Sequence, residues 1–235
     1  MLRGMNLLKL DAQSSFERWT STSPAPQVVS CLQAIGFGCA GFTALSLAVF
    51  ATWAFGGRFL YGNFGELGAY AVWCVLFLLG AGFMRPALTG PVSWGRFYGL
   101  FLASFITYAV LWTVAWMALH NRIGEWLGTG LGMAGMAAVL CGLFGVWRAI
   151  VPSFVVLFLG NAAGYFCGSW LHANTEAPWA QRLWGLCYGL GTGAGMGAAY
   201  YFCQAPLRAL INAQGDRKTP RIETELSQSE AAKEQ

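Results

Sequence analysis

The chain has 235 residues, of which 56% are hydrophobic and only 10% are charged. Soluble domains carry about 25% charged residues, so this composition excludes an ordinary soluble protein. The formal net charge of +4 reflects an uneven distribution of Lys and Arg along an apolar chain, and it does not indicate nucleic-acid binding.

Several continuous apolar runs are long enough to cross a bilayer, which takes roughly 20 helical residues. They do not alternate between apolar and polar residues, so helices are favoured over a barrel. We therefore predict an all-α, polytopic protein with six transmembrane helices over about 28–54, 67–84, 97–119, 128–147, 152–171 and 180–203. Together they form a transmembrane domain over 28–204.

The two ends of the chain are polar. Residues 1–27 are predicted to be a mostly disordered cytoplasmic leader, in which the LLKL sequence at 7–10 is a candidate for lying on the membrane surface. Residues 205–235 have few apolar side chains and are predicted to be a mostly disordered cytoplasmic tail. The stretch around Arg208 is expected to continue the last helix out of the membrane.

Basic residues predict the orientation. With the N-terminus inside, eleven Lys and Arg lie on the inner side, and only Arg58, Arg122 and Arg182 lie outside. Because Lys and Arg accumulate on the cytoplasmic side, we predict a multi-pass protein of the cell membrane with both termini cytoplasmic.

The first and fourth predicted spans each have small residues at every fourth position. The first has Gly36, Ala40 and Ala44, and the fourth has Gly130, Ala134 and Ala138. Small side chains allow helix backbones to approach closely in lipid, so these residues are predicted to pack helices together.

The same two spans align at a constant offset of 94 residues, which suggests a duplication. Two further matches keep the order: VLFL at 75–78 recurs at 156–159, and RFYGL from Arg96 resembles RLWGL from Arg182. We therefore predict a 3+3 inverted-topology repeat with halves of about 28–119 and 128–203, an arrangement that recurs in transporters. Coincidence within a restricted membrane alphabet is the alternative.

The fifth and sixth spans hold the candidate functional residues. Asn161 is an amide deep inside an apolar span and needs a hydrogen-bond partner there, and Tyr165 is one turn further on. In the sixth span, glycines recur at Gly185, Gly189, Gly193 and Gly197. Asn161, Tyr165, Gly189 and Gly193 are predicted either to line a solute path or to clamp helices together. Gly185 and Gly197 are predicted to pack helices.

Histidine and cysteine give little indication of a cofactor. His120 and His172 end outward-running spans, and Glu125 and Glu176 follow them, but neither spacing is a zinc signature. They are weak metal candidates, and we predict neither a metal nor another cofactor. The seven cysteines lie in or beside apolar spans without a CxxC pair and are expected to pack as small hydrophobes.

Tryptophans near span ends, Trp53 among them, are assigned to the aromatic belt at the membrane surface. Trp112 and Trp116, one turn apart, are expected to pack within the third span.

No nucleophile, metalloprotease or phosphate-binding motif occurs, so an enzyme is not predicted. The favoured function is a small permease or channel for a neutral or weakly charged small solute. The alternative is a non-catalytic structural or assembly subunit of a membrane complex. The predicted partners are the lipid bilayer and either further copies of the chain or a larger membrane complex, with no nucleic acid.

Overall fold

The computed structural model describes residues 8–23, 27–175 and 179–214, and this part of the chain is helical with no strands. Its elements are α1 (Ala12–Ser21), α2 (Cys31–Gly80), the 3-10 helix η1 (Ala81–Ala87), α3 (Trp94–Leu119), α4 (Arg122–Phe144), the 3-10 helix η2 (Trp147–Ala149), α5 (Ile150–Ala173) and α6 (Ala180–Cys203). The predicted all-α class is therefore confirmed.

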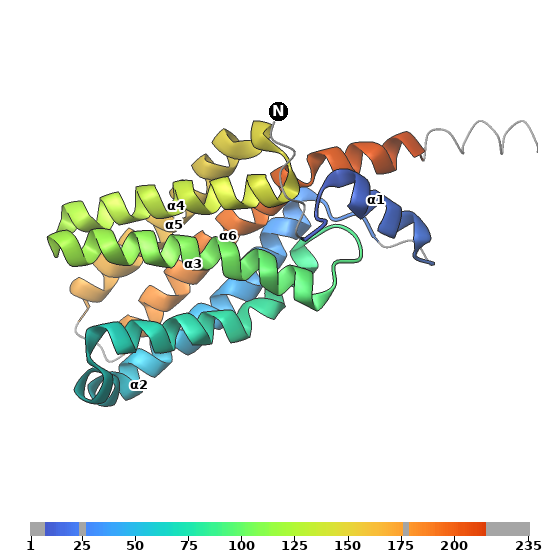
Figure 1. Cartoon of the computed structure of the whole chain (residues 1–235). Helices are drawn as coiled ribbons and strands as arrows, with labels where there is room; N and C mark the ends of the chain where they lie inside the picture. The colour runs from blue at the N-terminus through green and yellow to red at the C-terminus, as the bar shows by residue number, and fades with distance from the viewer. Residues whose placement is uncertain (1–7, 24–26, 176–178, 215–235) are drawn as a thin grey trace, which may run out of the picture.

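α2 is a hairpin rather than one straight rod (Figure 1). Its backbone leaves the helical region at Gly65, where φ is 65°, a value that favours glycine. The first limb (31–64) and the second limb (66–80) then run antiparallel, since the Phe42 and Phe77 rings stack with centroids 5.4 Å apart.

Four helical stretches are long and apolar enough to cross a membrane, namely Cys31–Ala87, Trp94–Leu119, Arg122–Phe144 and Trp147–Ala173. α6 is not among them, because its glycines and tyrosines lower its mean hydropathy. The predicted membrane-spanning helices are thus confirmed as a class. The six separate spans are not, since the first two fall within one stretch and the sixth is less apolar.

Local sequence determines where the helices begin and end. Ser30 and Gln33 form a capping box at the start of α2. His120 ends α3 in the left-handed conformation, and the Asn121 side chain accepts from two backbone N–H groups at the start of α4. α3 and α4 consequently form a tight hairpin.

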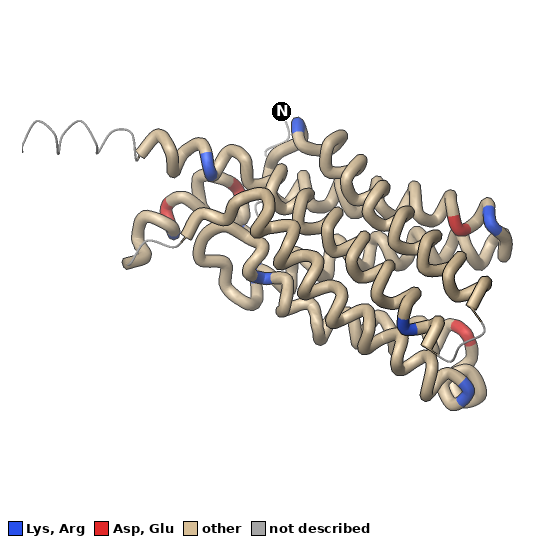
Figure 2. The backbone as a smooth tube through the Cα atoms, turned by 180° about the vertical axis from the view of Figure 1, so that it is seen from behind, with Lys and Arg blue, Asp and Glu red and all other residues tan. Residues whose placement is uncertain are grey.

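The long helices lie side by side as one bundle (Figure 1). We call the end with the Gly65 turn and the α3–α4 turn the turn end, and the opposite end the α1 end. Charged residues gather towards these two ends, and the middle of the bundle carries none among the described residues (Figure 2). This distribution fits a bundle that crosses a bilayer.

The α1 end is more ordered than the sequence predicts. The leader contains α1, whose N-cap Asp11 accepts from the Ser14 backbone, and Leu10 beside it is 2% exposed. The predicted mostly disordered leader is therefore wrong for residues 8–23, because Leu8 and Leu10 of LLKL pack against the bundle.

The tail also starts as a helix. Residues 205–214 continue beyond α6, with Leu207 and Ile211 buried, as expected for the stretch around Arg208. Residues 215–235 lie outside the described part of the chain. Just before this extension, the Gln204 side chain accepts from the Thr89 backbone N–H at 2.8 Å and donates to the Thr89 carbonyl at 3.0 Å. This pair of bonds fixes the loop before α3 to the end of α6.

Candidate functional site

Glycines on one side of α6 bring it into backbone contact with the first limb of α2. A side chain at Gly193 or Gly197 would collide with the backbone around Gly38 or Ala34, and one at Gly189 would meet the Thr43 Cα at 2.5 Å. Gly185 lies against the Phe50 side chain. Gly189 and Gly193 therefore lie in a close contact between α6 and α2.

A second row of glycines joins α6 to α5. A Cβ on Gly195 would lie 2.6 Å from the Val156 carbonyl oxygen, and one on Gly164 would lie 2.5 Å from the Cys187 carbonyl oxygen. α6 thus has small residues on two sides and separates α2 from α5 by little more than its own backbone.

The small residues predicted to pack the first and fourth spans lie away from the close contacts between helices. Gly36, Ala40, Ala44 and Ala134 are exposed, Gly130 and Ala138 are half-buried, and a Cβ on Gly36 or Gly130 would meet nothing within 4 Å. This set does not form the close contacts inside the bundle. Those contacts come from a neighbouring row, Ala34, Gly38 and Gly41 in α2 and Gly128, Gly132 and Gly135 in α4.

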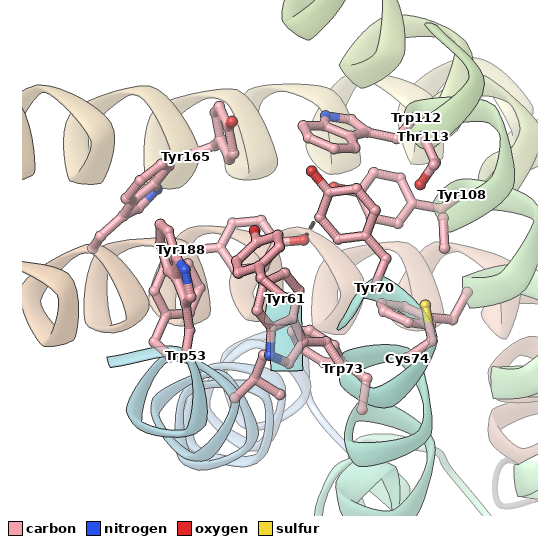
Figure 3. Close-up of a pocket in the computed structure, with 16 residues that line it drawn as sticks. Trp53, Tyr61, Tyr70, Trp73, Cys74, Tyr108, Trp112, Thr113, Tyr165 and Tyr188 are labelled. Carbon is pink, nitrogen blue, oxygen red and sulfur yellow. Dashed lines mark hydrogen bonds between the residues drawn. The ribbon is translucent and has the colours of Figure 1, made fainter. Parts of the chain in front are cut away.

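A cavity of about 220 Å³ lies between the two limbs of α2, α3, α5 and α6 (Figure 3). Twelve of the 16 residues that line it are aromatic: Tyr61, Tyr70, Tyr108, Tyr165, Tyr188, Trp53, Trp73, Trp112, Trp184, Phe50, Phe77 and Phe105. No Lys, Arg, Asp or Glu is among the lining residues. The wall is therefore apolar, with tyrosine hydroxyls as its main polar groups.

Three of the four tryptophans bury their polar atom. The indole nitrogens of Trp73, Trp112 and Trp184 are inaccessible to solvent and have no hydrogen-bond partner. Because these nitrogens are shielded, the three residues present ring carbon atoms to the cavity.

The floor of the cavity is a polar network at mid-depth. The hydroxyls of Tyr108 on α3 and Tyr188 on α6 are hydrogen bonded at 3.0 Å. Behind them, the fully buried Asn161 donates from Nδ2 to Thr192 Oγ1 at 3.1 Å and to the Tyr108 hydroxyl at 3.4 Å. Asn161 therefore joins α5 to α3 and α6, and it touches the cavity only through the tyrosine pair.

Two carboxylates lie at the turn end of the cavity, each bound to a lining tyrosine. Tyr70 donates to Glu66 at 3.0 Å, and Tyr165 donates to Glu125 at 3.2 Å. Glu125 also forms a salt bridge with Arg122 at 2.9 Å. Glu66 accepts a second bond from Trp116 Nε1 at 3.4 Å. Both partners of Glu66 are thus neutral donors.

Towards the α1 end the bundle is filled. Phe101 stacks on the lining residue Phe105 with centroids 5.2 Å apart, and Phe97, Met196 and Tyr200 beyond it have no exposed surface. The cavity is therefore closed on that side and lies in the half of the bundle nearer the turn end.

The two histidines pack against tryptophan rings. His120 packs on Trp116, and His172 stacks on Trp184 with centroids 5.5 Å apart. Glu176 lies outside the described residues. Within 8–23, 27–175 and 179–214, no group of three or more His, Cys, Asp or Glu could hold a metal ion.

The chain matches none of the protein-family models, curated proteins or solved structures with which it was compared. What the cavity could bind is therefore inferred from the residues that line it. The sequence predicts Tyr165 and, behind the floor, Asn161 as site residues, whereas the aromatic wall has no such signal in the sequence. Trp53, assigned to the membrane-surface belt, and Trp112, assigned to packing, both line the cavity.

Proposed function

We propose that this integral membrane protein is a small permease that binds a neutral or weakly charged small solute in the aromatic cavity. The observation that carries the proposal is a cavity of about 220 Å³ inside a bundle of membrane-spanning helices, with one side closed by packed core. Binding sites are typically concave, mostly apolar and provided with a few placed polar groups, as the Tyr108–Tyr188 pair is here.

The volume bounds the size of the solute. At about 220 Å³ the cavity lies below the range of about 300–1,000 Å³ typical of sites for drug-sized ligands, so a smaller solute is favoured. The orientation predicted from Lys and Arg places the turn end outside the cell, so the cavity belongs to an outward-facing state. A solute would enter near Tyr70 and Trp112 and stop at the tyrosine floor.

The packing rows support the inverted repeat that this proposal includes. Ala34 and Gly38 correspond to Gly128 and Gly132 at the offset of 94. The first pair packs on α6 and the second on α3, and the third and sixth spans are themselves the equivalents of one another. Exchanging the halves therefore maps these two helix contacts onto each other.

The halves differ where the cavity lies. α5 and α6 are joined by glycines, whereas the equivalent pair, the second limb of α2 and α3, contributes Tyr70, Trp73, Tyr108 and Trp112 to the cavity wall. The cavity also touches Tyr165, Trp184 and Tyr188 on α5 and α6. A difference in packing between equivalent helix pairs is nevertheless compatible with one state of alternating access.

The test is solute flux into liposomes containing the purified chain. Ala109 lines the cavity and Ala103, on the same helix, is exposed. Ala109→Trp fills the cavity and is expected to abolish flux, whereas the matched variant Ala103→Trp keeps it. A panel of labelled uncharged and singly charged solutes supplies the readout.

A structural or assembly subunit is the second candidate, because the ridge of Gly36, Ala40 and Ala44 faces outwards and is free to meet another helix. Absence of flux for every solute in the panel, together with co-purification in a larger complex, would exclude the permease and favour this alternative. Flux that is blocked by Ala109→Trp excludes a purely structural role.

A further inference from the structure

We propose that the solute of the aromatic cavity is an organic monocation whose charge is spread over alkyl groups, such as a quaternary or tertiary ammonium. This inference rests on the proposed function, because it assumes that the cavity receives a solute. It specifies the substrate class through two features, the aromatic rings of the wall and the carboxylate of Glu66 behind the lining residue Tyr70.

The aromatic wall favours a cation over a neutral solute of equal size. The face of an aromatic ring carries negative electrostatic potential, and cages of several rings recognise quaternary ammonium groups. Here the buried indole nitrogens of Trp73, Trp112 and Trp184 leave ring carbon as the exposed part of each residue. Tyr61 and Tyr70 also line the cavity and are labelled in Figure 3.

Glu66 adds a negative charge beside this cage. Its bonds come from the Tyr70 hydroxyl and the Trp116 indole, and no Lys or Arg of the described residues forms an ion pair with it. Donation from Tyr70 to a carboxylate also polarises the phenol and makes its ring more negative. Glu66 therefore makes the electrostatic potential at the lining residue Tyr70 more negative.

Two of the three arginines near the turn end are engaged elsewhere, and the third, Arg58, is exposed and does not line the cavity. Arg122 is paired with Glu125 at 2.9 Å, and the Arg182 guanidinium lies over the Phe55 ring at 5.2 Å. Neither lines the cavity. A cation entering the cavity therefore meets aromatic side chains, with the Glu66 carboxylate behind Tyr70 and no Lys or Arg among the lining residues.

The few polar atoms in the wall select among cations. A metal ion or a primary ammonium keeps several strong hydrogen bonds to water and would have to replace them on entry, which is costly in an apolar site. A quaternary ammonium has no N–H that needs a hydrogen-bond acceptor, so it loses far less hydration free energy when it leaves water. The alkylated cation is therefore the class that the wall accommodates.

The experiment compares choline with its uncharged isostere 3,3-dimethyl-1-butanol. Tryptophan fluorescence of the full chain in a non-ionic maltoside detergent is titrated with each probe, since four lining tryptophans report on occupancy. We expect saturable quenching by choline at a concentration at least tenfold lower than by the alcohol.

Three variants test whether Glu66 causes the preference for choline over the alcohol. Glu66→Gln is expected to weaken choline binding about tenfold and leave the alcohol unchanged, while Glu66→Asp keeps the preference for choline. Glu17→Gln makes the same charge change on the exposed face of α1, at the opposite end, and should alter neither titration. Size-exclusion profiles and helical circular dichroism show that each variant is folded.

The outcomes separate this inference from the proposed function. Equal affinity for choline and the alcohol would overturn the cation preference and leave a solute-binding cavity in place. An unchanged choline titration for Glu66→Gln would also overturn it. If neither probe binds the folded protein, the cation inference fails, and the liposome test with Ala109→Trp decides the permease separately.

Discussion

Replacing Gly193 by alanine tests the close backbone contact between α6 and α2. The added Cβ would lie 2.8 Å from the Gly38 carbonyl carbon and 2.9 Å from the Cys39 Cα, which are backbone atoms that cannot rotate away. Ordinary carbon contacts are about 3.5–4.0 Å long, so α6 and the first limb of α2 must separate by roughly 0.5–1 Å. That separation weakens the contacts of every neighbouring glycine as well.

The magnitude follows from two opposing effects. Overpacking of this kind typically costs about 1–3 kcal/mol. Alanine gains up to about 1 kcal/mol over glycine in helix propensity. We therefore expect Gly193→Ala to lower the free energy of unfolding by about 1–2 kcal/mol.

Gly36→Ala is the matched control. It makes the same chemical change on the same pair of helices, but its Cβ would meet nothing within 4 Å. Only the propensity gain remains, so this variant should be neutral or more stable by up to about 1 kcal/mol. Reversible unfolding in mixed detergent micelles, followed by circular dichroism, measures both. Equal stability of the two variants would refute the backbone contact between α6 and α2.

Three further predictions concern the network, the α1 end and the orientation. Asn161→Leu removes the bonds to the neighbouring helices and should destabilise the protein by about 0.6–2 kcal/mol in the same unfolding assay; no loss would mean that the amide is not a clamp. Gln204→Leu leaves the buried N–H and carbonyl of Thr89 unpaired, which costs about 1–3 kcal/mol for each group. Deuterium uptake in the loop before α3 should therefore increase. Unchanged uptake would contradict this pair of hydrogen bonds. Cysteines introduced in place of Arg58, Arg122 and Arg182 should react with an impermeant maleimide in intact cells, and absence of labelling would reverse the orientation.

Sequence alone was sufficient to predict long apolar helices and a face of α6 that lacks side chains. The four-residue spacing of Gly185, Gly189, Gly193 and Gly197 leaves one face without side chains, so a close contact follows whichever helix is opposite. For the first span the same reasoning selected the wrong face. Ala34 and Gly38 form one row of small residues and Gly36 and Ala40 another, and in lipid both faces of a helix are apolar. Hydrophobicity therefore cannot distinguish the row that packs from the row that faces outwards.

The cavity was not predictable because its wall is assembled from distant parts of the chain. Tyr61 and Tyr188 are separated by more than half the sequence, and tryptophans such as Trp53 also fit the membrane-surface belt. Asn161 stood out as a lone amide, but its partners Tyr108 and Thr192 come from other helices. A single sequence contains no record of such pairings.

The central place of α6 has a consequence for biosynthesis. It is the last long helix of the described chain to leave the ribosome, yet it separates α2 from α5 and contacts both through glycine. The earlier helices consequently cannot adopt their final spacing until translation has passed residue 203, and until then the small-residue faces of α2 and α5 remain open to lipid or to an insertion chaperone. A chain truncated before Ala180 is therefore expected to be degraded readily, whereas one truncated after Gln204 contains every long helix of the described bundle.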